Sequence, residues 1–245
     1  MRRSRGVLLI AHRGASAVAP EGTRAAIQGA VRAGAQMIEL DVQLMRDGRL
    51  VIFHDDRLER TTNGRGLVAS QRYAALSRLD AGRWFDPRFS GERILLVSEV
   101  FRLVPRRVGV NLELKRTKHR QKLVTGIRRL LARSRVGSRL LLLSSFDPNL
   151  IQPFLRTRLP RALICRRDPD RVLHQAIQLG CVAWHPFHEL VTPRRLTRAH
   201  AAGVRVHAWT VDDARRARQL IRWGVDGLFT NDPARLGRLL RRRGR

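Results

Sequence analysis

Short apolar runs alternate with amphipathic segments along almost the whole chain, and this rhythm constrains the fold more than any other feature. Runs of roughly four to eight residues predict buried strands, whereas apolar residues at helical spacing predict the helices between them. The predicted strands are Val7–Ala11, Met37–Leu44, Leu50–His54, Val108–Leu114, Leu140–Ser144, Ala162–Cys165, Cys181–Trp184, Val204–Thr210 and Gly227–Thr230. Such alternation is typical of βα units around a parallel sheet.

A single α/β domain over residues 1–245, a (β/α)8 TIM-type barrel, accommodates these runs if one of them is the second arm of a hairpin. The predicted helices are Arg24–Ala33, Tyr73–Ser77, Ser98–Val104, His119–Arg133, Pro169–Leu179, Thr192–Ala202 and Val211–Ile221. The stretch 55–99 is too long for an ordinary connection, so we expect a small inserted subdomain after the third strand. An open doubly wound sheet is the alternative, but no Gly-x-Gly-x-x-Gly turn follows the first strand.

The segment 38–55 contains two strands joined by Asp47-Gly48, a strong signal for a two-residue type I′ hairpin turn. Glu39 and Asp41 lie two residues apart on the first strand and therefore share a face. A two-residue turn would set Asp41 opposite His54. Two carboxylates and an imidazole would then converge within apolar segments, where unpaired carboxylates are costly unless a cation is present. The segment therefore predicts a metal site.

Glu113 lies at the end of another predicted strand, and the carboxyl ends of strands meet at the active-site rim of an α/β barrel. Glu39, Asp41 and Glu113 would supply three hard oxygen ligands, a set that favours Mg²⁺ or Ca²⁺ over Zn²⁺. The alternative is a site without metal, in which Glu113 forms a buried ion pair with Lys115 and Asp41 forms one with Arg13.

Two histidines, His12 and His54, end different strands near the same carboxylates. Because imidazole titrates near neutral pH, such a pair can divide the roles of general acid and general base. Arg13 and Lys115 bring fixed positive charge to the same rim, which suits a phosphate or phosphodiester. Cations, a divalent metal and an acid/base pair together predict phosphoryl chemistry.

Other histidines and the two cysteines have structural interpretations. His185 and His207 are weaker candidates, and we expect His207 to face the outer side of the barrel because apolar residues flank it. Cys165 and Cys181 lie in apolar segments without metal-ligand spacing, so we expect reduced thiols in the core.

The formal net charge of +29 would attract nucleic acid, anionic membranes or phosphorylated substrates. No alternation of aromatic and basic residues indicates base stacking, so we expect no specific nucleic-acid partner but weak, salt-sensitive contact with polyanions and anionic membranes. The apolar run Val7–Ala11 is shorter than a signal-peptide core, and no run approaches the ~18 apolar residues of a membrane span. We expect a cytoplasmic protein, and the sequence leaves its oligomeric state open.

Short motifs follow one another through the chain in a characteristic order and spacing. They are His12-Arg13-Gly14, Pro20-Glu21-Gly22-Thr23, Glu39-Leu40-Asp41-Val42, Asp47-Gly48, His54-Asp55, Thr61-Thr62-Asn63-Gly64, Gly91-Glu92-Arg93-Ile94, Asn111-Leu112-Glu113-Leu114-Lys115, Ser145-Phe146, Trp209-Thr210-Val211 and Asp226-Gly227-Leu228-Phe229-Thr230. Together they resemble the glycerophosphodiester phosphodiesterase family over almost the whole chain. The resemblance implies a phospholipase-C-like barrel with a small insertion after the His-Asp segment.

The resemblance also implies residue roles. The positions matching Glu39, Asp41 and Glu113 hold a divalent cation, those matching His12 and His54 act as acid and base, and those matching Arg13 and Lys115 contact phosphate. We expect Glu21 and Trp209 near the substrate. The implied substrate is a small glycerophosphodiester, cleaved to sn-glycerol 3-phosphate and an alcohol. One route has the neighbouring glycerol hydroxyl attack phosphorus and give a cyclic phosphate, which water opens.

Three positions depart from the family pattern. Gly22 stands where asparagine is common, Ile94-Leu95-Leu96 lacks the usual Ile-Pro-Thr, and Asp212 follows Val211 where asparagine is frequent. Two other functions compete with the phosphodiesterase. A lysophospholipase D-type enzyme would take lysophospholipids through a hydrophobic groove built by the insertion, and a non-catalytic barrel would bind polyanions through its arginines.

Overall fold

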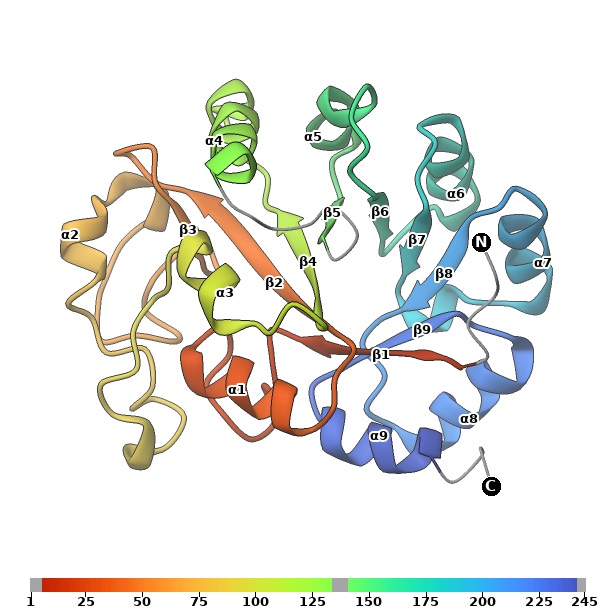
Figure 1. The fold of residues 1–245 in the computed structure, drawn as a ribbon, viewed down its shortest axis with the longest axis horizontal. Coiled ribbons are helices and arrows are strands. Elements are labelled where there is room, and N and C mark those ends of the chain that lie inside the picture. The colour runs from red at the N-terminus through yellow and green to blue at the C-terminus, as the bar shows by residue number, and fades with distance from the viewer. Residues whose placement is uncertain (1–5, 134–140, 242–245) are drawn as a thin grey trace.

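The computed structural model describes residues 6–133 and 141–241, and within them eight parallel strands close into a barrel surrounded by helices (Figure 1). The strands are β1 Leu8–His12, β2 Met37–Leu44, β3 Leu50–Ile52, β4 Gly109–Leu114, β5 Leu141–Ser145, β6 Arg161–Cys165, β7 Ala183–Pro186, β8 Arg205–Ala208 and β9 Gly227–Thr230. The α-helices are α1 Arg24–Arg32, α2 Tyr73–Leu76, α3 Val97–Leu103, α4 Arg120–Arg133, α5 Pro148–Ile151, α6 Pro169–Gln178, α7 Pro193–Ala201, α8 Ala214–Trp223 and α9 Pro233–Arg241. Short 3₁₀ helices are η1 Val68–Ser70, η2 Pro87–Phe89, η4 Gln152–Phe154 and η5 His188–Leu190.

Barrel closure depends on β1, which pairs in parallel with both β2 and β9. The longer strand β2 pairs with β1 through its first residues and carries the antiparallel arm β3 on its last ones. This arrangement confirms the predicted (β/α)8 barrel with one hairpin arm, and the open-sheet alternative is wrong.

The hairpin register differs by one residue from the expectation. Val42 pairs with Ile52, and the amide of Phe53 donates to the carbonyl of Asp41 at 3.0 Å, so Phe53 rather than His54 lies opposite Asp41. The connection has three residues instead of two, because the amide of Met45 donates to the carbonyl of Arg49 at 2.9 Å. In such a loop only the last residue adopts a positive φ, and Gly48 does so at 79°.

The core lies between the outer face of the barrel and the helices. Alternate strand residues such as Ile38, Leu40 and Leu112 point outward into one large hydrophobic cluster and are fully buried. Burial of each large apolar side chain stabilises the fold by ~1.5–3 kcal/mol. The residues between them, including Glu39 and Asp41, therefore face the barrel interior.

Most of the predicted helices agree with the structure to within a few residues. Thr23 caps α1 by accepting a hydrogen bond from the amide of Ala26, as its sequence position suggests. Two helices, α5 and α9, were not expected from the sequence. The predicted strand Leu140–Ser144 agrees with β5, although Leu140 itself lies outside the described residues.

The segment 55–99 lies at one side of the barrel beside α1 and α3 (Figure 1). It contains η1, α2, η2 and the start of α3, and it packs a second hydrophobic cluster against the hairpin. That cluster consists of Met45, Val51, Phe53, Leu58, Val68, Leu76, Ala81 and Ile94. Two apolar side chains of the segment stay exposed instead, Leu67 at 47% and Trp84 at 40%.

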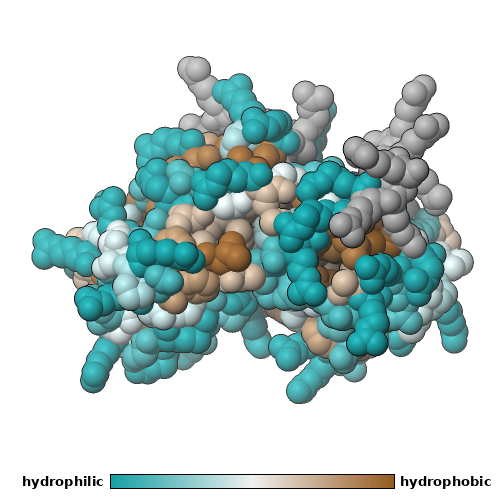
Figure 2. Space-filling model, turned by 90° about the horizontal axis from the view of Figure 1, so that it is seen from below, coloured by the Kyte–Doolittle hydropathy of each residue, from teal (hydrophilic) through white to brown (hydrophobic). Residues whose placement is uncertain are grey.

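Hydrophilic residues cover most of the face shown in Figure 2, and hydrophobic residues gather there in smaller patches. None of the helices in the described ranges is both long and apolar enough to cross a membrane. Cys165 and Cys181 are buried free thiols, as predicted, and burial raises the pKa of each to about 11. Both thiols therefore stay protonated at neutral pH.

Candidate active site

The loop after β1 brings Arg13 to the carboxyl rim of the barrel in a left-handed conformation, with φ of 55°. Its amide donates to Glu39 Oε2 at 3.1 Å. Gly14 follows with φ of 86°, and a Cβ atom there would lie 2.7 Å from the carbonyl carbon of Ala26 in α1. Only glycine fits this close approach of loop and helix, and the strained turn is typical of functional sites.

Three carboxylates gather on the neighbouring strands β2 and β4. Asp41 is the register partner of Glu113, and Glu39 precedes Asp41 on the same face. One oxygen of each residue lies within 4.8 Å of the others. Burial, followed by the charges of Asp41 and Glu113, raises the pKa of Glu39 well above its usual value. Burial and Asp41 raise the pKa of Glu113 to about 7.

Two permanent cations reach into the same cluster. Lys115 Nζ lies 3.3 Å from Asp41 Oδ1 and 3.2 Å from Glu113 Oε1, and Arg13 Nε lies 3.2 Å from Asp41 Oδ2. Burial disfavours the charge of Asp41, but Lys115 and Arg13 outweigh it, so the pKa of Asp41 is lowered. Both ion pairs of the metal-free alternative are therefore present.

The two cations do not balance the charge of three ionised carboxylates. Glu39 Oε1 is buried and has no hydrogen-bond partner among the described residues. An unpartnered buried carboxylate oxygen beside two further carboxylates fits a divalent cation, and an all-oxygen donor set suits Mg²⁺ or Ca²⁺. These residues thus fit the metal that the sequence predicts.

His12 ends β1 directly beside the carboxylates. Its Nε2 lies 4.0 Å from Glu39 Oε2, while its Nδ1 lies 2.8 Å from Asn231 Oδ1. Burial and then the charge of Arg13 lower the pKa of His12 to about 4, so its imidazole is neutral at physiological pH. A neutral imidazole can accept a proton.

His54 lies near the cluster despite the shifted hairpin register. Its charge contributes to the lowered pKa of Asp41 and to that of His12. The Nδ1 atom lies 2.6 Å from Asp55 Oδ1, which is hydrogen-bonding distance. Asp55 in turn accepts from Arg60, and the hydrogen bond from Arg60 holds the pKa of Asp55 at about 2.

Arg60 connects the insertion to the barrel rim. Besides Asp55 it binds Glu21, with its Nη2 atom 2.6 Å from Glu21 Oε1. Glu21 Oε1 also accepts a hydrogen bond from Arg13 Nη1 at 3.0 Å. The predicted contact residue Glu21 is therefore held between two arginines, one from each part of the structure.

The other predicted contact residue, Trp209, follows β8 on the opposite part of the rim. Its indole NH donates to the carbonyl of His185 at 2.8 Å. Its ring makes edge contacts with Phe146 after β5 and Phe187 after β7. The rim thus has an acidic, metal-compatible part on β1, β2 and β4 and an aromatic part on β5, β7 and β8.

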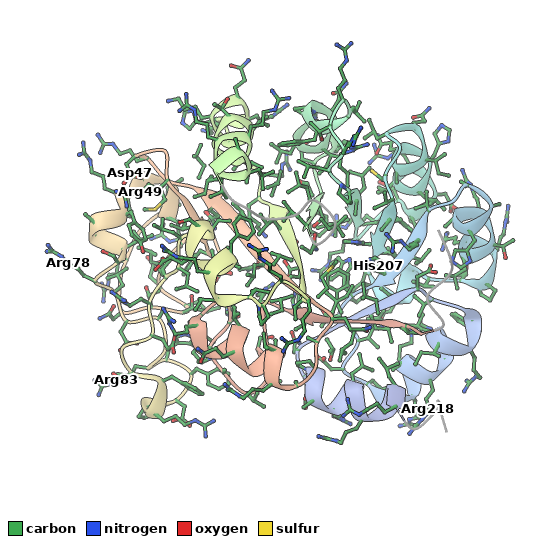
Figure 3. All side chains as sticks on the ribbon, viewed as in Figure 1. Asp47, Arg49, Arg78, Arg83, His207 and Arg218 are labelled. Atoms are coloured by element: carbon green, nitrogen blue, oxygen red, sulfur yellow. The ribbon has the colours of Figure 1, made fainter. Side chains whose placement is uncertain are left out.

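His207 was expected on the outer face of the barrel, and this prediction is wrong. The side chain points in among the strands, whereas Arg78, Arg83 and Arg218 lie at the periphery (Figure 3). It is 2% exposed, and its Nδ1 lies 3.2 Å from His185 Nε2. The flanking residues Val206 and Ala208 instead pack outward, because neighbouring strand residues face opposite sides. Burial lowers the pKa of His207 to about 3 and that of His185 well below its usual value, so both imidazoles are neutral at physiological pH.

A model of the glycerophosphoryl diester phosphodiesterase family matches residues 12–235, which include every residue placed at this rim. The chain belongs to this family. Membership of the family confirms the predicted enzyme class and the predicted barrel fold.

Two members of the glycerophosphodiester phosphodiesterase family resemble the chain over most of their length. The enzyme of that name from Caldanaerobacter subterraneus subsp. tengcongensis is 36% identical over 245 residues, which cover 97% of this chain and 99% of the relative. The one from Bacillus subtilis is 30% identical over 93% of this chain and 84% of the relative.

Solved structures of the family share the fold. An Oleispira antarctica phosphodiesterase, in complex with the product sn-glycerol-3-phosphate, superimposes with a TM-score of 0.90 at 31% identity, covering 96% of this chain and 97% of that one. The glycerophosphodiester phosphodiesterase of Agrobacterium tumefaciens gives 0.77 at 29% identity, covering 93% and 97%.

Several rim residues were not proposed as site residues from the sequence. Asn231 contacts His12, and Arg60 contacts Asp55. Asp212, noted from the sequence only as a departure from the family pattern, contacts Asn231. Asn111 is fully buried next to Glu39 in the strand register, and neither polar atom of its amide has a partner among the described residues. Its position two residues before Glu113, and so on the same strand face, is the sequence signal that could have revealed it.

Proposed function

We propose that this chain hydrolyses glycerophosphodiesters to sn-glycerol 3-phosphate and an alcohol. The observation that carries the proposal is the cluster of three carboxylates, Glu39, Asp41 and Glu113, lying within 4.8 Å beside two cations and two histidines. The product-bound Oleispira antarctica enzyme, at a TM-score of 0.90, supports the same product.

Glu39, Asp41 and Glu113 would hold a divalent cation, Mg²⁺ or Ca²⁺. Bound there, the ion would stabilise negative charge on the phosphoryl oxygens of the diester. Lys115 and Arg13 pair with Asp41 in the structure. Both would also bind the substrate phosphate through charge-assisted hydrogen bonds. Glu21 would keep Arg13 in place through its 3.0 Å contact.

His12 and His54 would carry the protons. In the first step, one imidazole accepts the proton of the glycerol hydroxyl adjacent to the phosphoester, and the hydroxyl oxygen forms a bond to phosphorus. The bond from phosphorus to the alcohol oxygen breaks, and the other imidazole protonates the departing alcohol. The neutral state of His12, whose pKa is lowered to about 4, suits it to accept the first proton.

In the second step, water opens the cyclic phosphate formed in the first. The histidine that donated a proton now accepts one from water, the water oxygen bonds to phosphorus, and the ring oxygen leaves as the glycerol hydroxyl with a proton from the other histidine. Both imidazoles return to their initial states, and the product is sn-glycerol 3-phosphate. Trp209 would border the substrate from the aromatic part of the rim.

We further propose that residues 1–245 act as one phosphodiesterase barrel domain with 55–99 as an inserted subdomain, and that the protein is cytoplasmic. The second cluster of buried apolar residues supports a separate packing unit in the insertion. The surplus of arginines supports weak electrostatic contact with anionic membranes and polyanions rather than a specific nucleic-acid partner.

A lysophospholipase D-type activity is the second candidate, because the insertion exposes Leu67 and Trp84. Val68 and Leu76, which could also have lined a groove, pack instead into the second hydrophobic cluster. Fewer apolar side chains thus remain for a lipid chain, and the small diester is the favoured substrate. Binding of polyanions by a non-catalytic barrel would not require a buried cluster of carboxylates, so this function is disfavoured.

The substrate proposal is tested by product analysis with purified protein and divalent metal. Glycerophosphocholine, glycerophosphoethanolamine and lysophosphatidylcholine are compared by ³¹P NMR, which also detects a cyclic phosphate. Sn-glycerol 3-phosphate from the first two substrates would support the proposal. Turnover of the lysolipid alone would replace it with the second candidate.

A further inference from the structure

A chain of hydrogen bonds runs from Asp212 through Asn231 to His12. Asn231 Nδ2 lies 2.6 Å from Asp212 Oδ2, and Asn231 Oδ1 lies 2.8 Å from His12 Nδ1. The three residues follow or end the consecutive barrel strands β8, β9 and β1. Barrel closure therefore brings them together although 219 positions separate His12 from Asn231.

Hydrogen bonds from Asn231 and from the preceding residue, Thr230, fix the carboxylate of Asp212. Its Oδ1 accepts from the amide of Asn231 at 2.8 Å and from the hydroxyl of Thr230 at 2.7 Å. The carbonyl of Asn231 accepts from the amide of Ala17, so the backbone at position 231 is fixed on both sides. The side-chain amide of Asn231 then has two possible orientations, with either its oxygen or its NH2 group facing His12.

The carboxylate of Asp212 determines this orientation. An ionised carboxylate only accepts hydrogen bonds, so the NH2 group of Asn231 must face Asp212. The amide oxygen of Asn231 then faces His12, and it also accepts from the hydroxyl of Ser16 at 2.9 Å. Because that oxygen is an acceptor, His12 Nδ1 must carry a hydrogen.

We infer that Asp212 and Asn231 are positioning residues that hold His12 in the tautomer with its proton on Nδ1 and with Nε2 unprotonated toward the carboxylate cluster. The inference rests on the proposed function, in which His12 exchanges protons with substrate. Nε2 is the nitrogen that lies 4.0 Å from Glu39 Oε2. Only an unprotonated Nε2 accepts a proton on that side.

The aspartate at position 212 is decisive because both of its carboxylate oxygens accept hydrogen bonds and neither can donate one. An amide at 212 could present either its oxygen or its NH2 group to Asn231. In Asp212→Asn, Asn231 is free to turn over and offer its NH2 group to His12 Nδ1. The proton of His12 would then move to Nε2, where it blocks proton acceptance.

Kinetics of four variants test the inference. Asp212→Asn should lower kcat by about tenfold or more while KM changes by less than about threefold, since acid–base catalysis contributes ~10²–10⁴ in rate. Asn231→Asp alone places two carboxylates in contact and should also lose activity. The double variant Asp212→Asn/Asn231→Asp reverses the polarity of the 2.6 Å bond but keeps an acceptor on His12, so kcat should return to within about threefold of wild type. Asp213→Asn is the control, because this neighbouring carboxylate caps α8.

Unchanged kcat in Asp212→Asn, or a double variant as impaired as the single ones, would overturn the inference.

Long-range ¹H–¹⁵N spectra of the imidazoles test the tautomer without activity. The His12 signals are assigned by their absence in His12→Ala. Wild type and Asp213→Asn should show the proton on Nδ1, Asp212→Asn should move it to Nε2, and the double variant should restore it. A wild-type proton on Nε2 would refute the inference even in an active enzyme. Absence of sn-glycerol 3-phosphate release with the expected spectrum would refute the proposed function instead.

Discussion

Asp55 Oδ1 lies 2.6 Å from Nδ1 of His54, its neighbour in sequence, and the same carboxylate is bound by Arg60 through two nitrogens. Arg60 extends the contact to Glu21. The insertion thereby fixes the orientation of a histidine at the rim of the barrel.

Replacement of Arg60 should therefore impair catalysis although Arg60 is not placed at the phosphate. Arg60→Ala removes one partner from Asp55 and one from Glu21, and we expect kcat to fall by about tenfold with the melting temperature changed by a few degrees at most. Arg57→Ala is the matched control, since Arg57 pairs with exposed Glu59 in the same segment. Equal kcat for the two variants would show that Arg60 does not orient the site.

The proposed acid and base should each be indispensable. We expect His12→Ala and His54→Ala to lower turnover by at least ~10²-fold, the lower end of acid–base contributions. Circular dichroism should show an unchanged fold. His174→Ala, on the exposed face of α6, controls for the loss of an imidazole and should turn over like wild type. A variant that retains near wild-type rate would remove that histidine from the mechanism.

The carboxylate cluster should set the metal requirement. Glu39→Gln removes a ligand charge at the position whose Oε1 has no protein partner. We expect the metal concentration for half-maximal activity to rise by about tenfold or more. Glu189→Gln makes the same chemical change at an exposed position and should leave that concentration unchanged. An unaltered metal titration in Glu39→Gln would place the metal elsewhere.

The raised pKa of Glu113 predicts a pH-dependent stability in EDTA. Its pKa is about 7 in the fold against an ordinary value of 4.5, so the native state binds the proton more tightly. The resulting stabilisation is complete below about pH 4.5 and is lost as the pH rises through about 7. Relative to Glu113→Gln, the wild-type free energy of unfolding should fall by roughly 3 kcal/mol between these limits. A difference that stays constant from pH 5 to 8 in urea unfolding would contradict the proposed protonation.

The barrel and its carboxylate cluster could be predicted because both depend on local pattern. Glu39 and Asp41 share a face through the two-residue period of a strand, and Glu113 joins them because β4 is the barrel neighbour of β2. The chain order of the strands, together with the rule that their carboxyl ends face the site, was enough to gather these residues at one rim.

What could not be predicted depends on register and on barrel closure. Asp47-Gly48 is compatible with a two-residue or a three-residue loop, and the choice moved the partner of Asp41 by one position. The contact between His12 and Asn231 exists only because β9 closes against β1. The inward orientation of His207 follows from its strand face, which its apolar neighbours concealed.

The measurement that tests the central claim most directly is release of sn-glycerol 3-phosphate from glycerophosphocholine by purified protein, before and after EDTA and after readdition of Mg²⁺ or Ca²⁺. The account predicts release that EDTA abolishes and that one of these ions restores. Release that persists in EDTA at the full rate would contradict a metal held by Glu39, Asp41 and Glu113, and no release under any of these conditions would contradict the proposed substrate.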